Sequence, residues 1–328
     1  MTWKQSRTQR TIAAIAFLVL IFDSRLALEG AQSGVELCIK TVIPSLFPFF
    51  VLSIILTNSS QDKSPYFIRR ISKALGISKA AETILIPAAL GGYPIGAKCV
   101  GDLYQRKQIS RYEAERLLAF CSNAGPAFLF GMVSGFFPEK KMVWLLWLIH
   151  LFSAVLTAAT IPVIKAKEHT LQPVKVSRNT STILSAASAM CCVCCWVILF
   201  RIIIHMLEVW IFWMLPEWAQ PLLMGILELT NGCCELLRIT EVKLRFVLCS
   251  CILAFGGICV LLQTASVTQG LSVGCYVKGK LTQTVFSFLM SCAIVSAHGL
   301  MIAASIPVWL YIFRKIQNKY GNPRPVPV

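Results

Sequence analysis

The chain has 328 residues, of which 56% are hydrophobic and only 14% are charged. Soluble domains carry about 25% charged residues, so this composition argues against a soluble globular protein. The formal net charge is +16, but the basic residues lie in loops and at the ends of apolar runs. A basic patch that binds nucleic acid requires clustering on one folded face, so we expect no nucleic-acid partner. An excess of Lys and Arg in loops is typical of membrane proteins.

Apolar runs of about 20 residues, the length that a helix needs to cross a hydrocarbon core, recur along the chain. The candidates lie at 11–28, 35–57, 82–104, 116–137, 142–164, 181–207, 219–237, 244–268 and 284–313. Open sheets cannot span lipid, because their edge backbone groups stay unsatisfied. The sequence therefore predicts an all-α polytopic membrane protein with about seven to nine membrane segments, some of them broken or re-entrant.

The first segment combines a basic start, MTWKQSRTQR, with the apolar run TIAAIAFLVLIF. This pattern resembles a signal peptide, but Asp23, Ser24 and Arg25 follow it instead of a small-residue cleavage site. We therefore expect an uncleaved N-terminal transmembrane helix within residues 1–30. Its flanking basic residues place the N-terminus in the cytoplasm.

The rest of the chain shows the same order of features twice. Each half has a long apolar segment, a short segment interrupted by Gly, a charged link, an apolar helix broken by small residues, and a final apolar span. The predicted units are 31–165 for the first repeat, 166–179 for a charged linker, 180–313 for the second repeat and 314–328 for a basic tail. Paired interrupted segments of this kind, in inverted repeats, are a pointer to the binding site of a secondary transporter.

The stretch LGGYPIGAKC (90–99) is the clearest interruption in the first half. Gly is poor in helix interiors and Pro removes a backbone donor. In lipid, the freed backbone groups are tolerated only where protein or water satisfies them. A half-helix beginning near Ile95 would present its positive end to an anion, and Lys98 would add a full charge. Alternatively, Lys98 extends to the membrane interface. We expect Lys98→Ala to abolish anion uptake without unfolding the protein.

Three further interruptions carry polar residues. They are FCSNAGPAF (120–128), ELTNG (228–232) and FGG (255–257), the last followed by Gln263. Glu228 is the candidate for binding a coupling ion, H⁺ or Na⁺, since acids within membrane segments often do so. The alternative for Glu228 is an interfacial position beside Trp218 and Gln220.

The predicted substrate-binding residues all lie at these interruptions. They are Gly92, Tyr93, Pro94, Gly96, Lys98, Ser122, Asn123, Gly125, Pro126, Glu228, Thr230, Asn231, Gly232, Gly256, Gly257 and Gln263.

Other reactive residues give weaker signals. The run CCVCC (191–195) has ligands for a soft metal, but cysteine also behaves as a small buried apolar residue. We expect no metal site and no cofactor. His298, in SAHGL, is expected to form a helix–helix hydrogen bond. No carboxylate pair, HExxH motif or nucleophile–base set appears at a useful spacing, so the sequence does not predict an enzyme.

Several stretches resemble a known family. They are IPSLFPFFVLS (43–53), GGYPIGAKCVGDLY (91–104), EAERLLAFCSNAGPAF (113–128), ELTNG and FGG with Gln263. Together they are similar to the YlbJ (SpoVV) type of sporulation integral membrane protein, over roughly residues 35–290. That family carries two nucleoside-recognition, or Gate, domains, similar to those of concentrative nucleoside transporters. The resemblance implies a multipass protein of the bacterial cell membrane, in the outer forespore membrane, that passes dipicolinate into the developing spore.

The leading hypothesis is a permease that moves a small organic anion by alternating access. Its partners would be the anionic solute, the lipid bilayer and a coupling ion. A dianion such as dipicolinate suits helix N-termini and a lysine better than a neutral nucleoside does. The alternatives are a transporter of a nucleoside-type solute and a non-transporting scaffold or assembly factor for spore formation. A scaffold should tolerate an apolar replacement of Asn123 or Asn231, whereas a permease should not.

Overall fold

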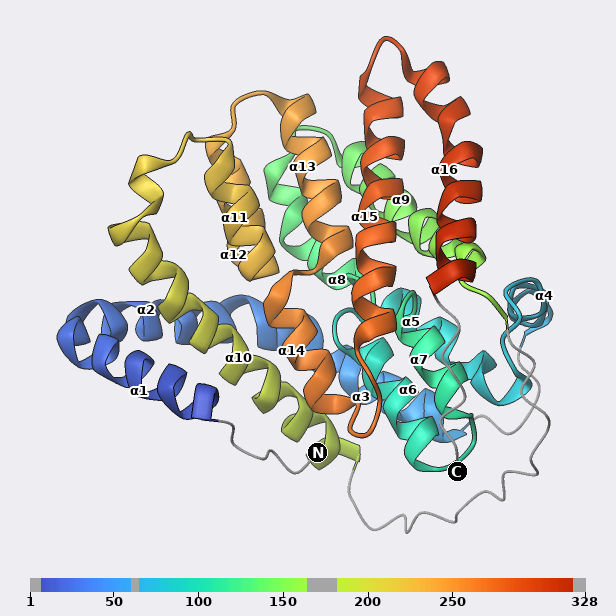
Figure 1. Ribbon diagram of the computed structural model, residues 1–328, viewed down its shortest axis with the longest axis horizontal. Coiled ribbons are helices and arrows are strands. Elements are labelled where there is room, and N and C mark those ends of the chain that lie inside the picture. Colours follow the sequence, from blue (N-terminus) through green and yellow to red (C-terminus); the bar gives the residue numbers. More distant parts are fainter. Residues whose placement is uncertain (1–6, 60–64, 164–181, 321–328) are drawn as a thin grey trace.

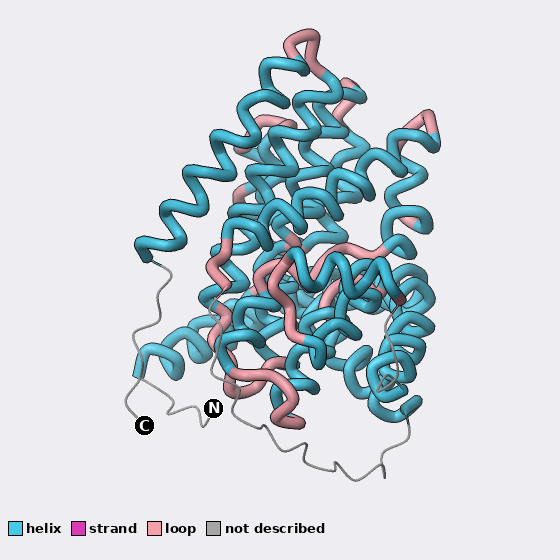
Figure 2. The backbone as a smooth tube through the Cα atoms, turned by 90° about the vertical axis from the view of Figure 1, so that its right-hand side faces the viewer, coloured by secondary structure: helices cyan, strands magenta, loops and turns pink. Residues whose placement is uncertain are grey.

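The computed structural model describes residues 7–59, 65–163 and 182–320, and none of these residues forms a β-strand. Helices of very different lengths pack together, as Figures 1 and 2 show. The predicted linker, 166–179, lies outside the described residues, as does 321–328 of the predicted tail. The all-helical prediction is confirmed for the described part of the chain.

The first half contains few long helices and many short ones. Its elements are α1 (Arg7–Phe22), α2 (Ser24–Leu37), η1 (Cys38–Val42), α3 (Ile43–Ser59), α4 (Tyr66–Ala74), η2 (Lys79–Ile84), α5 (Leu85–Leu90), α6 (Ile95–Gln105), α7 (Arg111–Leu118), α8 (Pro126–Gly131), η3 (Val133–Phe136) and α9 (Lys140–Thr160). The chain is continuously helical from α2 to α3, with a π-helical turn at η1. Pro44 and Pro48 lie just after this turn and lack the N–H that a regular helix needs.

The second half has longer helices. Its elements are α10 (Thr182–Trp210), η4 (Phe212–Met214), α11 (Ala219–Leu227), α12 (Leu229–Glu235), η5 (Leu236–Arg238), α13 (Val242–Phe255), α14 (Gly257–Val267), α15 (Gly274–Val295) and α16 (Gly299–Tyr320). Both halves have the same order of interrupted elements. The pair α5 and α6 corresponds to α11 and α12, the pair α7 and α8 to α13 and α14, and α9 to α15. That the halves are inverted repeats stays a prediction.

Five stretches are long and apolar enough to cross a membrane, by length and composition. They are Ser24–Leu52, Lys140–Thr160, Thr182–Trp210, Val242–Val267 and Gly299–Asn318. The expected segments 82–104, 116–137 and 219–237 are divided into short helices, and 11–28 covers parts of α1 and α2, so the count of seven to nine stays a prediction. The short pieces are the interrupted ones that the sequence singled out.

Three sequence-based boundaries are wrong. The expected span 284–313 is two helices, α15 and α16, joined by a turn at Ser296–His298 and packed as a hairpin (Figure 1). His298 is therefore exposed in that turn and does not lie within a span. The first helix ends at Phe22, and α2 runs through position 30 to Leu37. The predicted tail begins inside α16, which continues to Tyr320.

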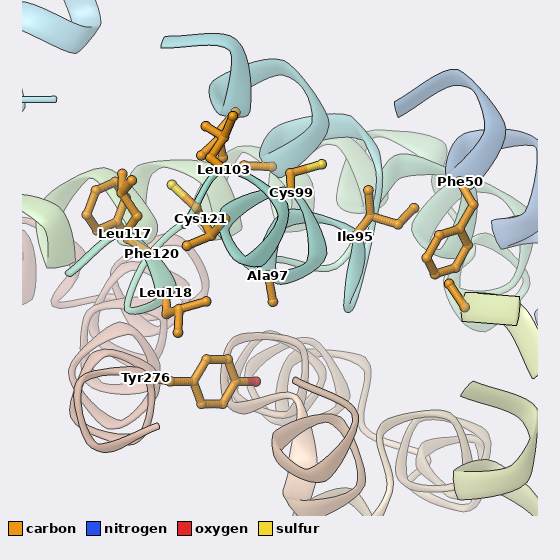
Figure 3. Packing of buried hydrophobic residues seen from close by; sticks show 14 of the residues in the cluster. Phe50, Ile95, Ala97, Cys99, Leu103, Leu117, Leu118, Phe120, Cys121 and Tyr276 are labelled. Carbon is orange, nitrogen blue, oxygen red and sulfur yellow. The ribbon is translucent and has the colours of Figure 1, made fainter. Parts of the chain in front are cut away.

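Two large clusters of buried apolar side chains form the core. One contains Phe50 of α3, Ile95 of α6, Leu117 of α7 and Tyr276 of α15. Figure 3 shows Phe50 at one end of this cluster and Leu117 and Phe120 at the other. The second cluster lies around α9, α12 and α13. The segment 119–125, which joins α7 to α8, contributes Cys121 to the first cluster and Ala124 to the second.

Helices α2 and α10 pack closely because two glycines of α2 face the α10 backbone. A Cβ atom at Gly30 would lie 2.9 Å from Cα of Ile202, and one at Gly34 would lie 2.9 Å from Cα of Ile198. Small residues at a helix interface allow this approach. Any larger residue must push the two backbones apart.

We predict that the double variant Gly30→Ala, Gly34→Ala unfolds at a lower temperature than the wild type in detergent. At each of the two sites, overpacking costs about 1–3 kcal/mol against a gain of about 1 kcal/mol in helix propensity, and we expect the overpacking to dominate because each Cβ would meet backbone atoms. Gly131→Ala on α8 is the control, since a Cβ there meets no atom within 4 Å. The control should unfold no earlier than the wild type. An equal or raised melting temperature of the double variant would show that the helices do not meet in this way.

Candidate functional site

Four interruptions of the helices meet near the centre of the molecule. They are the α5–α6 break at Gly91–Pro94, the unwound segment 119–125, the α11–α12 junction at Glu228, and the α13–α14 junction at Gly256. Gly92 and Gly256 have φ of +81° and +79°, which residues with a Cβ rarely adopt. The chain direction therefore changes at these points, as the glycines and prolines of the sequence indicate.

Side chains satisfy the backbone groups of the unwound segment. Asn123 Nδ2 donates to the Phe120 carbonyl at 2.7 Å, and the Ala124 N–H donates to His150 Nε2 at 2.9 Å. The Ser122 carbonyl accepts a hydrogen bond from Lys280 Nζ. An unpaired buried backbone group costs about as much as a lost hydrogen bond. These bonds allow a non-helical backbone to lie in an apolar interior.

Lys280, on α15, is a buried lysine at this centre, with 1% of its surface exposed. Besides the Ser122 carbonyl, its ammonium contacts Gln283 Oε1 at 2.7 Å, Tyr93 Oη at 3.0 Å and Asn123 Oδ1 at 3.5 Å. Within the described ranges it forms no salt bridge with a carboxylate. Gly279 allows α15 to come this close, because a Cβ there would overlap the Ala119 backbone.

Tyr93 connects three of the four interruptions. Its hydroxyl accepts from Lys280 and lies 3.1 Å from the Leu253 carbonyl, to which it donates. That carbonyl belongs to the last turn of α13, before the break at Gly256. A Cβ at Gly256 would lie 3.1 Å from Tyr93 Cζ, so the glycine also makes room for the ring.

Glu228 stabilises the fourth interruption, and its carboxylate caps α12. It accepts from the N–H groups of Thr230 at 3.0 Å and Asn231 at 2.8 Å, and from Asn231 Nδ2 at 2.6 Å. Negative charge at a helix N-terminus is favourable. Glu228 is 2% exposed within the protein, and the alternative of an interfacial position beside Trp218 and Gln220 stays a prediction. Its part in binding a coupling ion stays a prediction.

A small cavity lies between these interruptions, with a volume of about 40 Å³. At about 10–15 Å³ for each water, it has room for roughly three water molecules. A planar ring with two carboxylates does not fit. Its lining comes from η1, α3, α8, α10, α12 and α14, and from three of the four interruptions. The lining residues are Thr41, Val42, Ser45, Leu46, Gly92, Tyr93, Ala124, Gly125, Phe128, Val193, Val197, Glu228, Leu229, Thr230, Val260 and Gln263.

The predicted site residues occupy three kinds of position. Six line the cavity: Gly92, Tyr93, Gly125, Glu228, Thr230 and Gln263. Seven others lie at or beside the breaks but outside the cavity lining: Pro94, Ser122, Asn123, Pro126, Asn231, Gly256 and Gly257. Gly96 and Gly232 permit close backbone packing, because a Cβ at either would overlap Cys121 or Gly225.

Lys98 lies outside the lining of the cavity. Its ammonium forms an i,i+4 ion pair with Asp102 at 3.0 Å, and both side chains are partly exposed. The pair lies on α6, one turn beyond the break. The role of Lys98 in anion uptake stays a prediction, but the structure gives its charge a partner on its own helix.

The sequence-based list omitted Lys280, Gln283 and His150. A periodicity signal for the first two was present, since Tyr276, Lys280, Gln283, Ser287 and Ser291 are spaced by three or four residues and lie on one face of a helix. The assumed start of the last span at residue 284 cut this polar stripe in two. A similar signal was present for His150, since His150, Ser153, Thr157 and Thr160 are spaced by three or four residues and are buried on one face of α9.

One relative is informative about the class of protein. The chain is 27% identical over 316 aligned residues to the sporulation integral membrane protein YlbJ of Bacillus subtilis strain 168, covering 80% of this chain and 76% of the relative. No family model matches the chain, and no solved structure matches it. The relative and the apolar helices both support an integral membrane protein, and the relative's name is consistent with a role in sporulation.

We predict that Asn123→Leu lowers the free energy of unfolding by about 1–3 kcal/mol, the cost of leaving a buried polar group without a partner. The variant removes the acceptor of Gln283 Nε2, at 3.0 Å, and the donor to the Phe120 carbonyl. Gln105→Leu is the control, because within the described ranges that exposed amide bonds only to the Gln269 carbonyl. Denaturation of both variants in detergent measures the difference. Equal stabilities would show that the amide of Asn123 does not support the unwound segment.

Proposed function

We propose that the protein is a membrane permease that moves a small organic anion, dipicolinate, by alternating access into the developing spore. The observation that supports this most is a cavity lined at three of the four helix interruptions, with Gly256 of the fourth packed against Tyr93 of the lining. Secondary transporters place their sites at discontinuous helices near the middle of the membrane. The function requires no covalent chemistry and no cofactor.

The interruptions supply both a site and a means of opening it. Non-helical backbone at membrane depth is tolerated where it is buried in protein or lines a cavity. A small number of residues at each break can absorb the large changes in backbone dihedral angles that opening requires. The cavity of about 40 Å³ is too small for the solute, so this structure is proposed as a closed state between two open ones.

The polar groups of the lining suit a carboxylate solute. Thr41, Ser45, Thr230 and Gln263 are neutral hydroxyl and amide groups, which can donate to carboxylate oxygens. The carboxylate of Glu228 already accepts three hydrogen bonds from the N-terminus of α12. Dipicolinate and the outer forespore membrane come from the resemblance to YlbJ-type proteins, whose named member here is a sporulation protein.

A specific observation favours a second candidate, a membrane scaffold in spore formation. The polar side chains at the breaks already satisfy the backbone, with no solute required. Helix breaks that serve packing alone would look the same in a closed state. Transport must therefore be measured directly.

The test is uptake of radiolabelled dipicolinate into proteoliposomes, with uridine as a competing solute. We predict that Gln263→Met lowers uptake at low solute concentration by roughly tenfold to a hundredfold, because a hydrogen bond to a charged group contributes about 1.5–3 kcal/mol. The amide of Gln263 lines the cavity, and among the described residues it bonds only to Cys259 Sγ, at 3.2 Å.

Gln317→Met is the matched control, since this amide bonds to Thr160 of α9 and Thr282 of α15, neither of which lines the cavity. It should transport like the wild type. Folded wild-type protein that neither binds nor moves dipicolinate would exclude the permease for this solute. Uptake that uridine blocks would favour a nucleoside-type carrier, and no movement of either solute would favour the scaffold.

A further inference from the structure

We propose that Lys280 is the proton-binding group that couples solute movement to a proton gradient, and that its ammonium takes the place of a coupling metal cation. This inference rests on the proposed function as a carrier. It concerns a residue that does not line the cavity but donates to the hydroxyl of Tyr93, which does line it. The sequence left H⁺ and Na⁺ open as coupling ions, and the surroundings of Lys280 favour H⁺.

The atoms around Lys280 Nζ are suited to the protonated amine. All four contacts are oxygens: the Tyr93 hydroxyl, the Ser122 carbonyl, and the amide oxygens of Asn123 and Gln283. An ammonium has three donors and no acceptor, so each of its N–H groups has an oxygen to donate to, and the longest of the four contacts is Asn123 Oδ1 at 3.5 Å. A neutral amine has a lone pair, and the network offers it no free donor.

The orientation of both amides is fixed by other bonds. Asn123 Nδ2 donates to the Phe120 carbonyl at 2.7 Å, which turns Oδ1 away from that carbonyl. Gln283 Nε2 donates to Asn123 Oδ1 at 3.0 Å, and also lies 3.3 Å from the His150 carbonyl. The oxygen of Gln283 is therefore left for Lys280. Bonds that do not involve Lys280 therefore direct both amide oxygens toward its amine. We call these two oxygens, together with the Tyr93 hydroxyl and the Ser122 carbonyl, the oxygen cage of Lys280.

The charge has no carboxylate to hold it. Burying an ammonium without an ionic partner costs several kcal/mol, and in the described part of the chain no salt bridge reaches Lys280. Neutral oxygens offset part of this cost in a closed, water-excluded site. A cation held by dipoles alone can lose its charge when the cage opens, whereas one that pairs with a buried carboxylate would leave that carboxylate uncompensated.

The groups that face Lys280 from the neighbouring elements provide no competing acid. They are Tyr93 at the α5–α6 break, Tyr276 on α15 with its ring 5.8 Å from Nζ, Cys121 on the unwound segment and His150 on α9. His150 Nε2 accepts from the Ala124 N–H, so protonation at that nitrogen would break this bond.

Charged residues of the other neighbours are directed elsewhere. Arg116 of α7 donates to the Leu75 and Gly76 carbonyls, and Arg314 and Lys315 of α16 are exposed. Helix α13 meets α15 through the hydroxyls of Ser250 and Ser287.

The proton then controls a mechanical connection. The ammonium ties α15 to the α5–α6 break through Tyr93 and to the unwound segment through Ser122 and Asn123. When the cavity opens to the side of lower proton concentration, the proton passes from Nζ to water and no other covalent bond changes. The neutral amine holds these elements less tightly, so solute movement and proton release occur together, one proton for each cycle.

The experiment compares two assays in proteoliposomes loaded with dipicolinate. Exchange of labelled for unlabelled solute at equal pH needs no net proton movement, whereas accumulation against a gradient needs coupling. For the wild type we expect accumulation driven by an imposed pH gradient, with the same rate when K⁺ replaces Na⁺. Lys280→Met should retain measurable exchange but lose gradient-driven accumulation by at least tenfold, and Lys280→Arg, with a charge that is always present, should do the same.

Lys278→Met is the matched control, because this exposed lysine lies on the same helix. It should preserve both assays. A second variant, Tyr93→Phe, removes one oxygen acceptor from the cage and keeps the ring. Its accumulation should reach half-maximum at a more acidic pH than that of the wild type, since its ammonium is less well stabilised.

Each other result overturns the proposal in a different way. Accumulation by Lys280→Met at the wild-type level, a requirement for Na⁺, or an unchanged pH profile of Tyr93→Phe would remove the coupling role. Loss of exchange in folded Lys280→Met would make Lys280 a solute-binding group instead. Absence of exchange in the wild type would refute the carrier itself, and with it the inference.

Discussion

The need to satisfy backbone polar groups wherever a helix is interrupted in an apolar interior determines most of this structure. At three of the four breaks, a side chain supplies hydrogen bonds to the backbone. Asn123 and His150 do so for the unwound segment, Tyr93 for the end of α13, and Glu228 for the start of α12. Asn123 and Glu228 serve the backbone beside them, whereas Tyr93 and His150 come from other segments of the chain. The bond of Tyr93 to the Leu253 carbonyl therefore also fixes the α5–α6 break next to the end of α13.

The same bonds make the centre both stable and capable of change. A regular helix repeats equivalent hydrogen bonds, and loosening one end leaves the rest intact. At a break, a few side-chain bonds hold the whole arrangement, so the loss of one has a large effect. This effect is largest for Lys280, because the presence of one proton determines how many hydrogen bonds its amine can donate. A scaffold would gain nothing from placing a titratable group at that point, whereas a carrier that uses a gradient would.

The sequence predicted the breaks well and their partners poorly. Gly and Pro act on the local backbone, so LGGYPIGAKC and FGG indicated the correct positions without tertiary information. Glu228 and Asn123 were also found, since a polar residue beside a break serves the adjacent backbone. From the sequence, the positive charge of the anion site was assigned to Lys98, the lysine nearest to the break along the chain. In the structure Lys98 pairs with Asp102 on its own helix, and the buried lysine comes from α15.

The amino-acid sequence by itself therefore determined the class of protein and the interrupted elements, because hydropathy and backbone chemistry are local properties. It could not determine the α15–α16 hairpin, since a turn of Ser, Ala and His looks like a continuation of an apolar run. Nor could it determine which lysine is buried. Two lysines on α15, Lys278 and Lys280, differ only in the face they occupy. That face is fixed by the approach of Gly279 to the unwound segment, a contact between residues about 160 positions apart, and only the packed tertiary structure brings them together.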